Sequence, residues 1–296
     1  MTMDGNKLWM DAPAKLNLRL RVLGRRADGF HEVETLMVPL PGLEDRVEVE
    51  DAPEFLFECD GDGVPADESN LAVRALRMFE RVWGGEIKVR LRLEKRVPHG
   101  AGLGGGSSDA AAVLRLLARR SGGVGDRELQ EMAAELGSDV TFFLHDGPAW
   151  CRGRGERIER ASGVVAVPVV LLKPWFGVAT PDAYGRWRDA VPLDGVDHAP
   201  QASAAGELVN DLERPVFAKH LFLAELREWL RGRAEVEAAL MSGSGSTVFG
   251  VLRDEAAAQG VIAAAREELD PGLWGWGGWT GALNSQHPTS NIEGRT

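Results

Sequence analysis

The sequence of 296 residues predicts an α/β protein of the α+β type, with two domains and a functional site in the cleft between them. One observation is strict alternation of apolar and polar side chains, as in Ile87–Glu94, which is typical of a strand in an antiparallel sheet. The other is that helical patterns with cap residues and glycine stops lie between such strands. We expect a first domain over residues 1–158 and a second over residues 159–283, where helices pack on an antiparallel sheet.

Composition and charge narrow the class of protein. Hydrophobic residues make up 44% and charged residues 27% of the chain, as in soluble globular proteins. The net charge of −11 argues against a nucleic-acid partner or an acidic membrane surface. The sequence has no secretory signal and no apolar run of the roughly 20 residues that a membrane span needs. Cys59 and Cys151 form neither a disulfide framework nor a metal-ligand pattern, so we expect a cytoplasmic protein without a metal site of its own.

The first domain begins with strand patterns. Lys15 and Asn17 are two residues apart in the first of them, so their side chains point the same way in an extended chain. A helix should follow the N-cap residue Asn70, and another should follow Asp126 and end at Gly137. The expected strands are Lys7–Leu23, Val33–Val38, Asp45–Val49, Glu54–Cys59 and Ile87–Glu94, and the expected helices are Leu71–Trp83 and Arg127–Leu136.

The stretch Val97–Ala110, VPHGAGLGGGSSDA, carries the strongest functional signal. It has five glycines within seven residues, and a helical pattern opens immediately afterwards. Glycines let successive backbone N–H groups face an anion, and the helix adds its unpaired first N–H groups and the positive end of its dipole. Ser107 and Ser108 are placed to cap this helix, or to bond phosphate oxygens and a bound metal. The geometry predicts a site for a polyphosphate.

Three other interpretations of this stretch are possible. It contains the dinucleotide fingerprint Gly100-x-Gly102-x-x-Gly105, but that fingerprint follows a buried parallel strand, and the strand here alternates. A Walker loop is excluded because no Gly-Lys-Ser/Thr follows the glycines. A turn that serves packing alone is disfavoured by the density of glycines at the start of a helix. A phosphate loop of another type remains.

The rest of the chain supplies one acidic candidate and the second domain. Asp139 stands directly before an apolar run, at the mouth of a buried segment. Thr180 should cap a helix with Pro181 in its first position, and this helix carries the only tyrosine, Tyr184. Glycines in the loop Ser242–Ser246 suggest a close approach to the phosphate loop. The remaining expected elements are a strand in Val164–Leu172, a loop over Pro192–Ala205, a helix over Val216–Leu230, a strand over Thr247–Leu252, a helix over Asp254–Leu269 and a closing strand in Pro271–Trp279.

Three motifs in order resemble one superfamily. These are PAKLNL from Pro13, PHGAGLGGGSSDAA from Pro98 and MSGSGSTVF from Met241. Together they resemble the galactokinase, homoserine kinase, mevalonate kinase and phosphomevalonate kinase (GHMP) superfamily. RRADGFHE from Arg25 is similar to the branch that phosphorylates a cytidine diphosphate-linked substrate in the non-mevalonate isoprenoid precursor pathway. The similarity runs from about Ala12 to Leu283, and the polar tail 284–296, in which Ile292–Arg295 resembles an engineered protease site, is left out.

The resemblance implies an ATP-dependent kinase with Mg²⁺ carried on ATP, in which Asp139 is the catalytic aspartate and Lys15 lies beside it. It places cytosine between Phe30 and Tyr184, with His31 at the base edge; the family usually has tyrosine where Phe30 stands. Asn17 and Thr180 join the substrate side. The implied ATP site comprises Asn70, Lys95, Pro98, His99, Gly100, Ala101, Gly102, Leu103, Gly104, Gly105, Gly106, Ser107 and Ser108.

Two alternatives stay open at this point. One is another kinase of the superfamily, acting on mevalonate or homoserine, and the other is a nucleotide-binding relative that has lost catalysis. Lys15 and Asp139 argue against the second, and Phe30, His31 and Tyr184 argue for the cytidine substrate. The expected partner is a small molecule, and the expected state is a monomer or homodimer.

Overall fold

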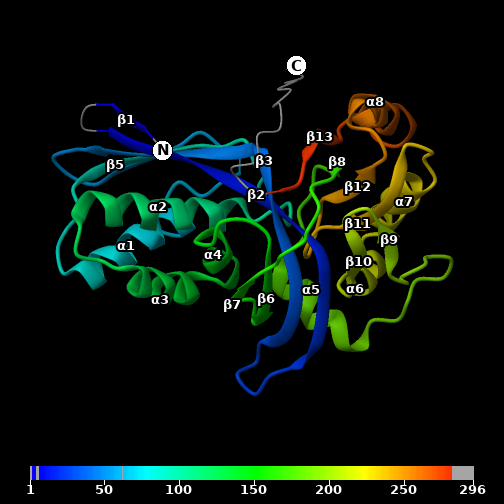
Figure 1. Cartoon of the computed structure of the whole chain (residues 1–296), viewed down its shortest axis with the longest axis horizontal. Helices are drawn as coiled ribbons and strands as arrows, with labels where there is room; N and C mark the ends of the chain where they lie inside the picture. The colour runs from blue at the N-terminus through cyan, green and yellow to red at the C-terminus, as the bar shows by residue number, and fades with distance from the viewer. Residues whose placement is uncertain (1, 5–6, 62, 282–296) are drawn as a thin grey trace.

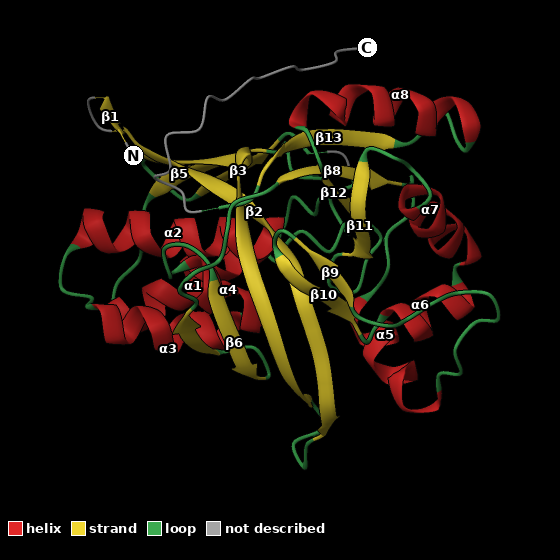
Figure 2. Cartoon of the chain, turned by 45° about the vertical axis from the view of Figure 1, so that its right-hand side comes forward, coloured by secondary structure: helices red, strands yellow, loops and turns green. Residues whose placement is uncertain are grey.

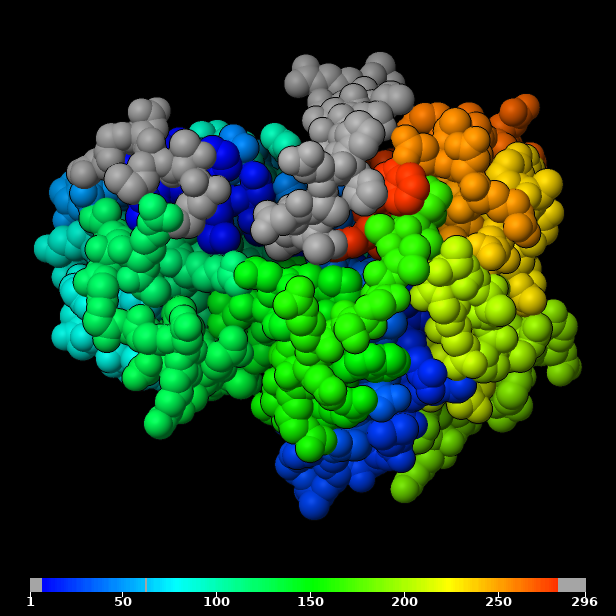
Figure 3. All heavy atoms as spheres, in the orientation of Figure 1, coloured from blue at the N-terminus to red at the C-terminus, as the bar shows by residue number. Residues whose placement is uncertain are grey.

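The computed structural model describes residues 2–4, 7–61 and 63–281, so the polar tail lies outside the described residues. The chain forms two lobes (Figure 1). Helices α1–α4 lie in one lobe and α5–α8 in the other, with the long strands β2 and β3 running between them (Figures 1 and 2). The turn that joins these two strands projects as the blue lower edge of the space-filling view (Figure 3).

The larger sheet holds nine strands within the described residues, and their main order is β4-β5-β3-β2-β10-β9. Its pairs are antiparallel except β4 with β5 and β2 with β10. Strand β10 belongs to the later half of the chain, so the sheet continues across the expected domain boundary at Ile158. The strands are β1 (Thr2–Asp4), β2 (Lys7–Arg25), β3 (His31–Asp51), β4 (Leu56–Cys59), β5 (Val89–Glu94), β6 (Ala149–Gly153), β7 (Arg157–Arg160), β9 (Gln201–Ser203) and β10 (Gly206–Asn210).

The alternation that predicted β5 is confirmed. Val89, Leu91 and Leu93 are buried, while Arg90 and Arg92 are exposed. Two expectations need correction: the predicted strands over residues 33–38 and 45–49 are one strand, β3, and β5 has one parallel neighbour, β4. The irregularities in the β2–β3 register explain the first difference, because they let one strand carry a broken alternation.

Four helices cover one face of this sheet (Figure 2). The Asn70 side chain accepts a hydrogen bond from the backbone N–H of Ala72, so the predicted N-cap is confirmed. The phosphate-loop helix starts earlier than expected, with Gly104 at its N-cap, so Ser107 and Ser108 lie inside its first turn rather than capping it. The N-cap of the third helix is likewise Gly125, one residue before Asp126. The helices are α1 (Leu71–Trp83), α2 (Gly105–Ser121), α3 (Asp126–Leu136) and α4 (Ser138–Phe143).

The second lobe packs helices on an antiparallel four-stranded sheet within the described residues, in the order β11-β12-β8-β13. Two expectations are wrong in detail. The single helix expected over residues 216–230 is two helices that meet at His220, and Thr180 is the first residue of its helix, whereas Ala179 is the N-cap. The elements are β8 (Pro168–Lys173), α5 (Thr180–Arg186), α6 (Glu213–Lys219), α7 (Leu221–Arg231), β11 (Val236–Met241), β12 (Val248–Leu252), α8 (Ala258–Glu268) and β13 (Trp274–Trp279), with 3₁₀ turns at Trp187–Asp189 and Glu255–Ala257.

A hydrophobic core between the two lobes holds the phosphate loop in place. Leu16 and Leu18 of β2 pack there with Leu171 of β8 and Phe249 of β12. Leu103 of the phosphate loop is 1% exposed and belongs to the same cluster. Apolar burial of this kind is the main favourable term in folding, so the loop is anchored from both lobes.

Candidate active site

The phosphate loop takes a conformation that requires glycine at two central positions. Gly102 and Gly104 have φ of +73° and +74°, a region that side chains with a Cβ rarely adopt. A Cβ on Gly102 would collide with the carbonyl oxygen of Ser242, and one on Gly104 would lie 3.0 Å from the Phe143 ring. The loop is therefore closely packed from behind and presents its open side to the pocket.

The third motif approaches the phosphate loop, as its glycines suggested. The Ser242 hydroxyl donates to the carbonyl oxygen of Gly102 at 3.1 Å. The backbone N–H of Thr247 donates to the carbonyl oxygen of Ala101, also at 3.1 Å. The amide of Asn210, at the end of β10, donates to the carbonyl oxygens of Met241 and Gly243 at 2.7 Å each. The second lobe thus fixes the back of the phosphate loop through hydrogen bonds to its backbone carbonyl oxygens.

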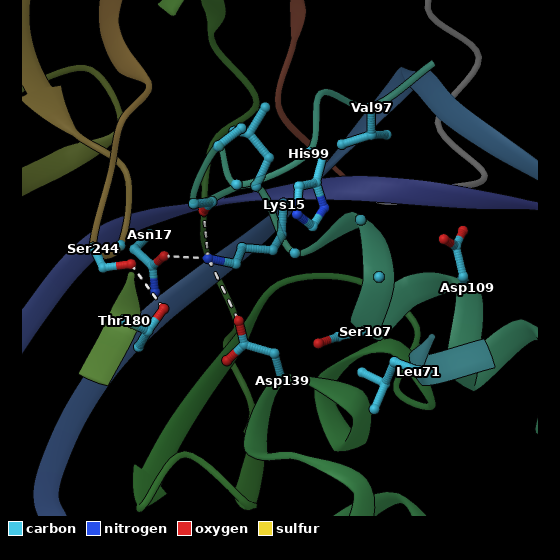
Figure 4. Close-up of a pocket in the computed structure, with 18 of the residues that line it drawn as sticks. Lys15, Asn17, Leu71, Val97, His99, Ser107, Asp109, Asp139, Thr180 and Ser244 are labelled. Carbon is cyan, nitrogen blue, oxygen red and sulfur yellow. Dashed lines mark hydrogen bonds and ion pairs between the residues drawn. The ribbon is translucent and has the colours of Figure 1, made fainter. Parts of the chain in front are cut away.

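Lys15 lies at the centre of the pocket with its ammonium group held by three oxygens (Figure 4). The Nζ atom donates to Asn17 Oδ1 at 2.6 Å and to the carbonyl oxygen of Gly102 at 2.8 Å, and it lies 3.6 Å from Asp139 Oδ2. The amide of Asn17 donates in turn to the Thr35 hydroxyl at 2.8 Å. As predicted, Lys15 and Asn17 point the same way from β2, and a bonded network sets the orientation of both.

Burial and the charge of Asp139 have opposite effects on the Lys15 ammonium. Burial lowers the pKa of Lys15, and the negative charge of Asp139 opposes that shift. The Lys15 side chain is 4% exposed, whereas that of Asp139 is 34% exposed at the start of α4. The carboxylate is therefore open to the pocket while the ammonium is enclosed.

A pocket of about 400 Å³ joins these groups between the lobes. Asn70, Lys95 and the loop from Pro98 to Ser107 line one side, and Asp139 lines the floor near Lys15. Asn17, Thr180 and Tyr184 line the other side. The Thr180 hydroxyl lies 2.9 Å from that of Ser244, at the tip of the third motif (Figure 4). Its partner explains why Thr180 does not cap α5.

Three of the predicted residues lie outside the lining of this pocket. Ser108 is 2% exposed and lines a smaller cavity, of about 40 Å³, behind α2. The His31 ring packs on the Tyr184 ring at 5.2 Å between centroids. Phe30 is 53% exposed, and its ring faces the guanidinium of Arg154 at 4.8 Å instead of facing Tyr184. The two aromatic rings expected to enclose a base are therefore not opposed.

Burial shifts the pKa values of His31 and Tyr184. The pKa of His31 is lowered, first by burial and then by the positive charge of Arg25, so the imidazole is neutral at pH 7. Burial raises the pKa of the Tyr184 hydroxyl, and the negative charge of Asp139 adds to this shift. Both side chains can therefore offer neutral polar groups to a ligand.

The pocket also contains residues that sequence reasoning did not identify. Arg154 lies on its wall, in the turn that follows β6. Ser244 contacts Thr180, and although it belongs to the third motif, the motif alone gave it no role. Asp45 and Asp109 pair with Lys95 below the loop. Asp109 stands in the glycine-rich motif and Asp45 begins an expected strand, but only the tertiary contacts show that both meet Lys95.

Within the described part of the chain, no group of three or more histidine, cysteine, aspartate or glutamate side chains is placed to hold a metal ion. No helix among those residues is long and apolar enough to cross a membrane.

Comparison with known families gives the class of protein. Residues 70–147 match the family model of the GHMP kinases N terminal domain, and residues 198–270 match that of the GHMP kinases C terminal, so the chain is a GHMP-type kinase. Solved structures with this fold include a homoserine kinase from Cytophaga hutchinsonii, with a TM-score of 0.66 at 18% identity over 95% of this chain and 96% of that one.

Similarity to one branch is much higher. A 4-diphosphocytidyl-2-C-methyl-D-erythritol kinase of Methylacidiphilum infernorum is 43% identical over 89% of this chain and 93% of its own length. The enzyme of that name from Bacillus cytotoxicus is 40% identical over 84% of this chain and 89% of its own. A crystal structure of a 4-(cytidine 5'-diphospho)-2C-methyl-D-erythritol kinase superposes with a TM-score of 0.76 at 37% identity, covering 93% of this chain and all of that one. The chain belongs to the 4-diphosphocytidyl-2-C-methyl-D-erythritol kinase family of the GHMP kinases.

Proposed function

We propose that this enzyme transfers the γ-phosphoryl group of ATP to the 2-hydroxyl of 4-diphosphocytidyl-2-C-methyl-D-erythritol, in the non-mevalonate pathway to isoprenoid precursors. The observation that carries this proposal is the distance of 3.6 Å between Lys15 Nζ and Asp139 Oδ2, beside a glycine loop in one pocket. Phosphoryl transfer to an alcohol needs positioning, neutralised charge and a group to take the proton. These three requirements correspond to the glycine loop, Lys15 and Asp139.

Asp139 accepts the proton of the acceptor hydroxyl in this proposal. Its carboxylate is one-third exposed, so it reaches the pocket, and the Lys15 ammonium lies 3.6 Å from it. Lys15 also offsets negative charge that builds up on the transferring group. Because Asn17 and the carbonyl oxygen of Gly102 hold the ammonium, its position is set before substrates bind.

ATP binds along the glycine loop, with its adenosine end toward Asn70. The open backbone N–H groups and the start of α2 suit the triphosphate, and Ser107 presents a hydroxyl at the same place (Figure 4). Mg²⁺ prefers oxygen ligands and usually stays bound to phosphates and waters rather than to a full protein cage. The Ser107 hydroxyl and the Asp139 carboxylate are oxygen donors that fit such an ion. When bound with ATP, it supplies charge neutralisation between the phosphate groups.

The cytidine diphosphate group binds on the other side of Asp139. Arg154 lines the pocket there and offers a guanidinium to a diphosphate. Tyr184, Phe30 and the neutral His31 imidazole lie around the same region and suit the face and the edge of a cytosine base. Closure of Phe30 toward Tyr184 around the base accompanies binding in this proposal.

A phosphorylation assay tests the assignment. Purified enzyme with ATP and Mg²⁺ is offered 4-diphosphocytidyl-2-C-methyl-D-erythritol, mevalonate and homoserine side by side, and product is measured by mass. We expect phosphate transfer to the cytidyl compound with kcat/KM at least about a hundredfold above the others, because only it meets the base and diphosphate contacts. Preferred phosphorylation of mevalonate or homoserine would overturn the substrate assignment. ATP binding without transfer to any of the three would indicate a non-catalytic relative.

A further inference from the structure

The Lys95 ammonium is buried between two carboxylates below the phosphate loop. Its Nζ atom contacts Asp45 Oδ2 and lies 2.5 Å from Asp109 Oδ2, and the three side chains are 7%, 0% and 2% exposed. Removing such charges from water costs several kcal/mol per ion, so a buried cluster adds little stability over apolar residues. The position of the cluster therefore indicates a purpose other than stability alone.

The cluster joins both ends of the phosphate loop. On the N-terminal side, Asp45 Oδ1 accepts the backbone N–H groups of Arg96 at 2.6 Å and of Val97 at 2.8 Å, directly before Pro98. On the C-terminal side, Asp109 follows Ser108 in α2 and meets the same ammonium. Strand β3, the start of the loop and the first turns of α2 are thus linked by one cation.

The surroundings leave little freedom for these links to shift. A Cβ on Gly105 would lie 3.0 Å from Val97 and 3.3 Å from Asp45 Oδ2, so the first turn of α2 packs against the cluster. The backbone N–H of Lys95 donates to Asp60 Oδ1 at 2.7 Å. A loop held at both ends loses less conformational freedom when it binds its ligand, which favours tight binding.

The contact with Lys95 is what ties α2 to the cluster. Asp109 Oδ2 lies 2.5 Å from the ammonium, and its Oδ1 atom has no hydrogen-bond partner among the described residues. The carboxylate of Asp109 is therefore held through Lys95.

We propose that Lys95 is a positioning residue for ATP: with Asp45 and Asp109 it holds both ends of the phosphate loop in the conformation that binds the triphosphate. This inference rests on the proposed function, because it assumes that the loop binds ATP. The proposal differs from a direct contact of Lys95 with the nucleotide. It requires Asp45, which belongs to the cluster but does not line the pocket.

Asp45→Asn is the deciding variant. It breaks one of the two links to the ammonium, because an amide NH₂ replaces Oδ2, whereas Oδ1 can still accept both loop N–H groups and Lys95 stays paired with Asp109. We expect the dissociation constant for ATP, measured by calorimetry with Mg²⁺, to rise at least about tenfold, because the loop must be ordered on binding. The dissociation constant for the cytidyl substrate should change less than about twofold. An Asp45→Asn enzyme that is folded and binds ATP as tightly as the wild type would overturn the inference.

A second variant removes the cation without leaving two unpaired carboxylates. In Lys95→Met/Asp109→Asn only Asp45 stays charged, and Arg96 and Val97 still donate to it. The same selective loss of ATP affinity is expected, and equal losses for both ligands would also contradict the inference. The control is Leu226→Ala in α7, a fully buried site in the second lobe, which lowers the melting temperature without touching the loop. Its ATP affinity should equal that of the wild type, and failure of the wild type itself to bind ATP would instead refute the proposed function.

Discussion

Replacing Asp139 by asparagine tests the chemistry of the pocket most directly. The variant keeps the size of the side chain and removes both the charge and the proton acceptor. The interaction that is lost with Lys15 Nζ, 3.6 Å away, is worth about 5 kcal/mol at an effective dielectric constant of about 20 and about 1 kcal/mol at about 80. Because the carboxylate is 34% exposed, solvent screening places the value toward the lower end.

The effect on turnover is larger than the effect on folding. A general base contributes roughly 10² to 10⁴-fold, and we therefore expect kcat to fall by about that factor, or about 3 to 5 kcal/mol in activation free energy. Lys15 retains Asn17 and the carbonyl oxygen of Gly102 as acceptors, so the ammonium stays in place. Both substrates have their main contacts elsewhere, and their dissociation constants should change less than about threefold.

Single-turnover kinetics with saturating ATP and cytidyl substrate measures this loss without interference from product release. Asp146→Asn is the matched control, because it makes the same chemical change on an exposed aspartate that pairs with Arg115 outside the pocket. Its turnover should equal that of the wild type. A folded Asp139→Asn enzyme with near-normal turnover would remove Asp139 from the mechanism and leave the kinase assignment on the phosphate loop.

The double variant with Lys15→Met adds a test of coupling. Residues that act as one unit are non-additive, so the double variant should be little slower than the slower single variant. Multiplication of the two single effects would show instead that Lys15 and Asp139 act independently.

Three further predictions concern ATP, cytidine and stability. Gly104→Val should weaken ATP binding by at least about tenfold in calorimetry, because it places a branched side chain at φ +74°, 3.0 Å from the Phe143 ring; unchanged affinity in a folded variant would refute the loop assignment. Binding of the cytidyl substrate should be constant above pH 7 and weaken only below the usual histidine pKa of 6.5, because the pKa of His31 is lowered and only its neutral form can accept a hydrogen bond; a His31→Gln variant that keeps the same pH dependence would exclude this histidine. Asn70→Ala should lower the free energy of unfolding by about 0.5 to 2 kcal/mol in denaturant titrations, because α1 loses its N-cap bond to Ala72, and an unchanged free energy would contradict this account.

Those features of the fold and site that depend on local pattern could be predicted from the sequence. Alternation along β5 predicted which side chains are buried, and Asn70 was recognisable as the start of a helix. Lys15 and Asn17 were expected on one side of β2 because a strand repeats every two residues, and their hydrogen bond of 2.6 Å confirms it. The order of the three motifs was enough for the family, since each motif is continuous in the chain.

Contacts between residues that are far apart in the sequence depend on the tertiary structure. Asp139 comes within 3.6 Å of Lys15 because α4 packs against α2 while β2 passes beside the phosphate loop, and no local pattern encodes that distance. The joining of β10 to β2 and the pairing of Lys95 with Asp45 and Asp109 depend in the same way on strand register and helix packing. The Phe30 ring makes a cation–π contact with Arg154, which is far away in the sequence. No local pattern could predict this contact. Periodicity sets the face on which a side chain lies, whereas its partner is chosen by how the elements pack.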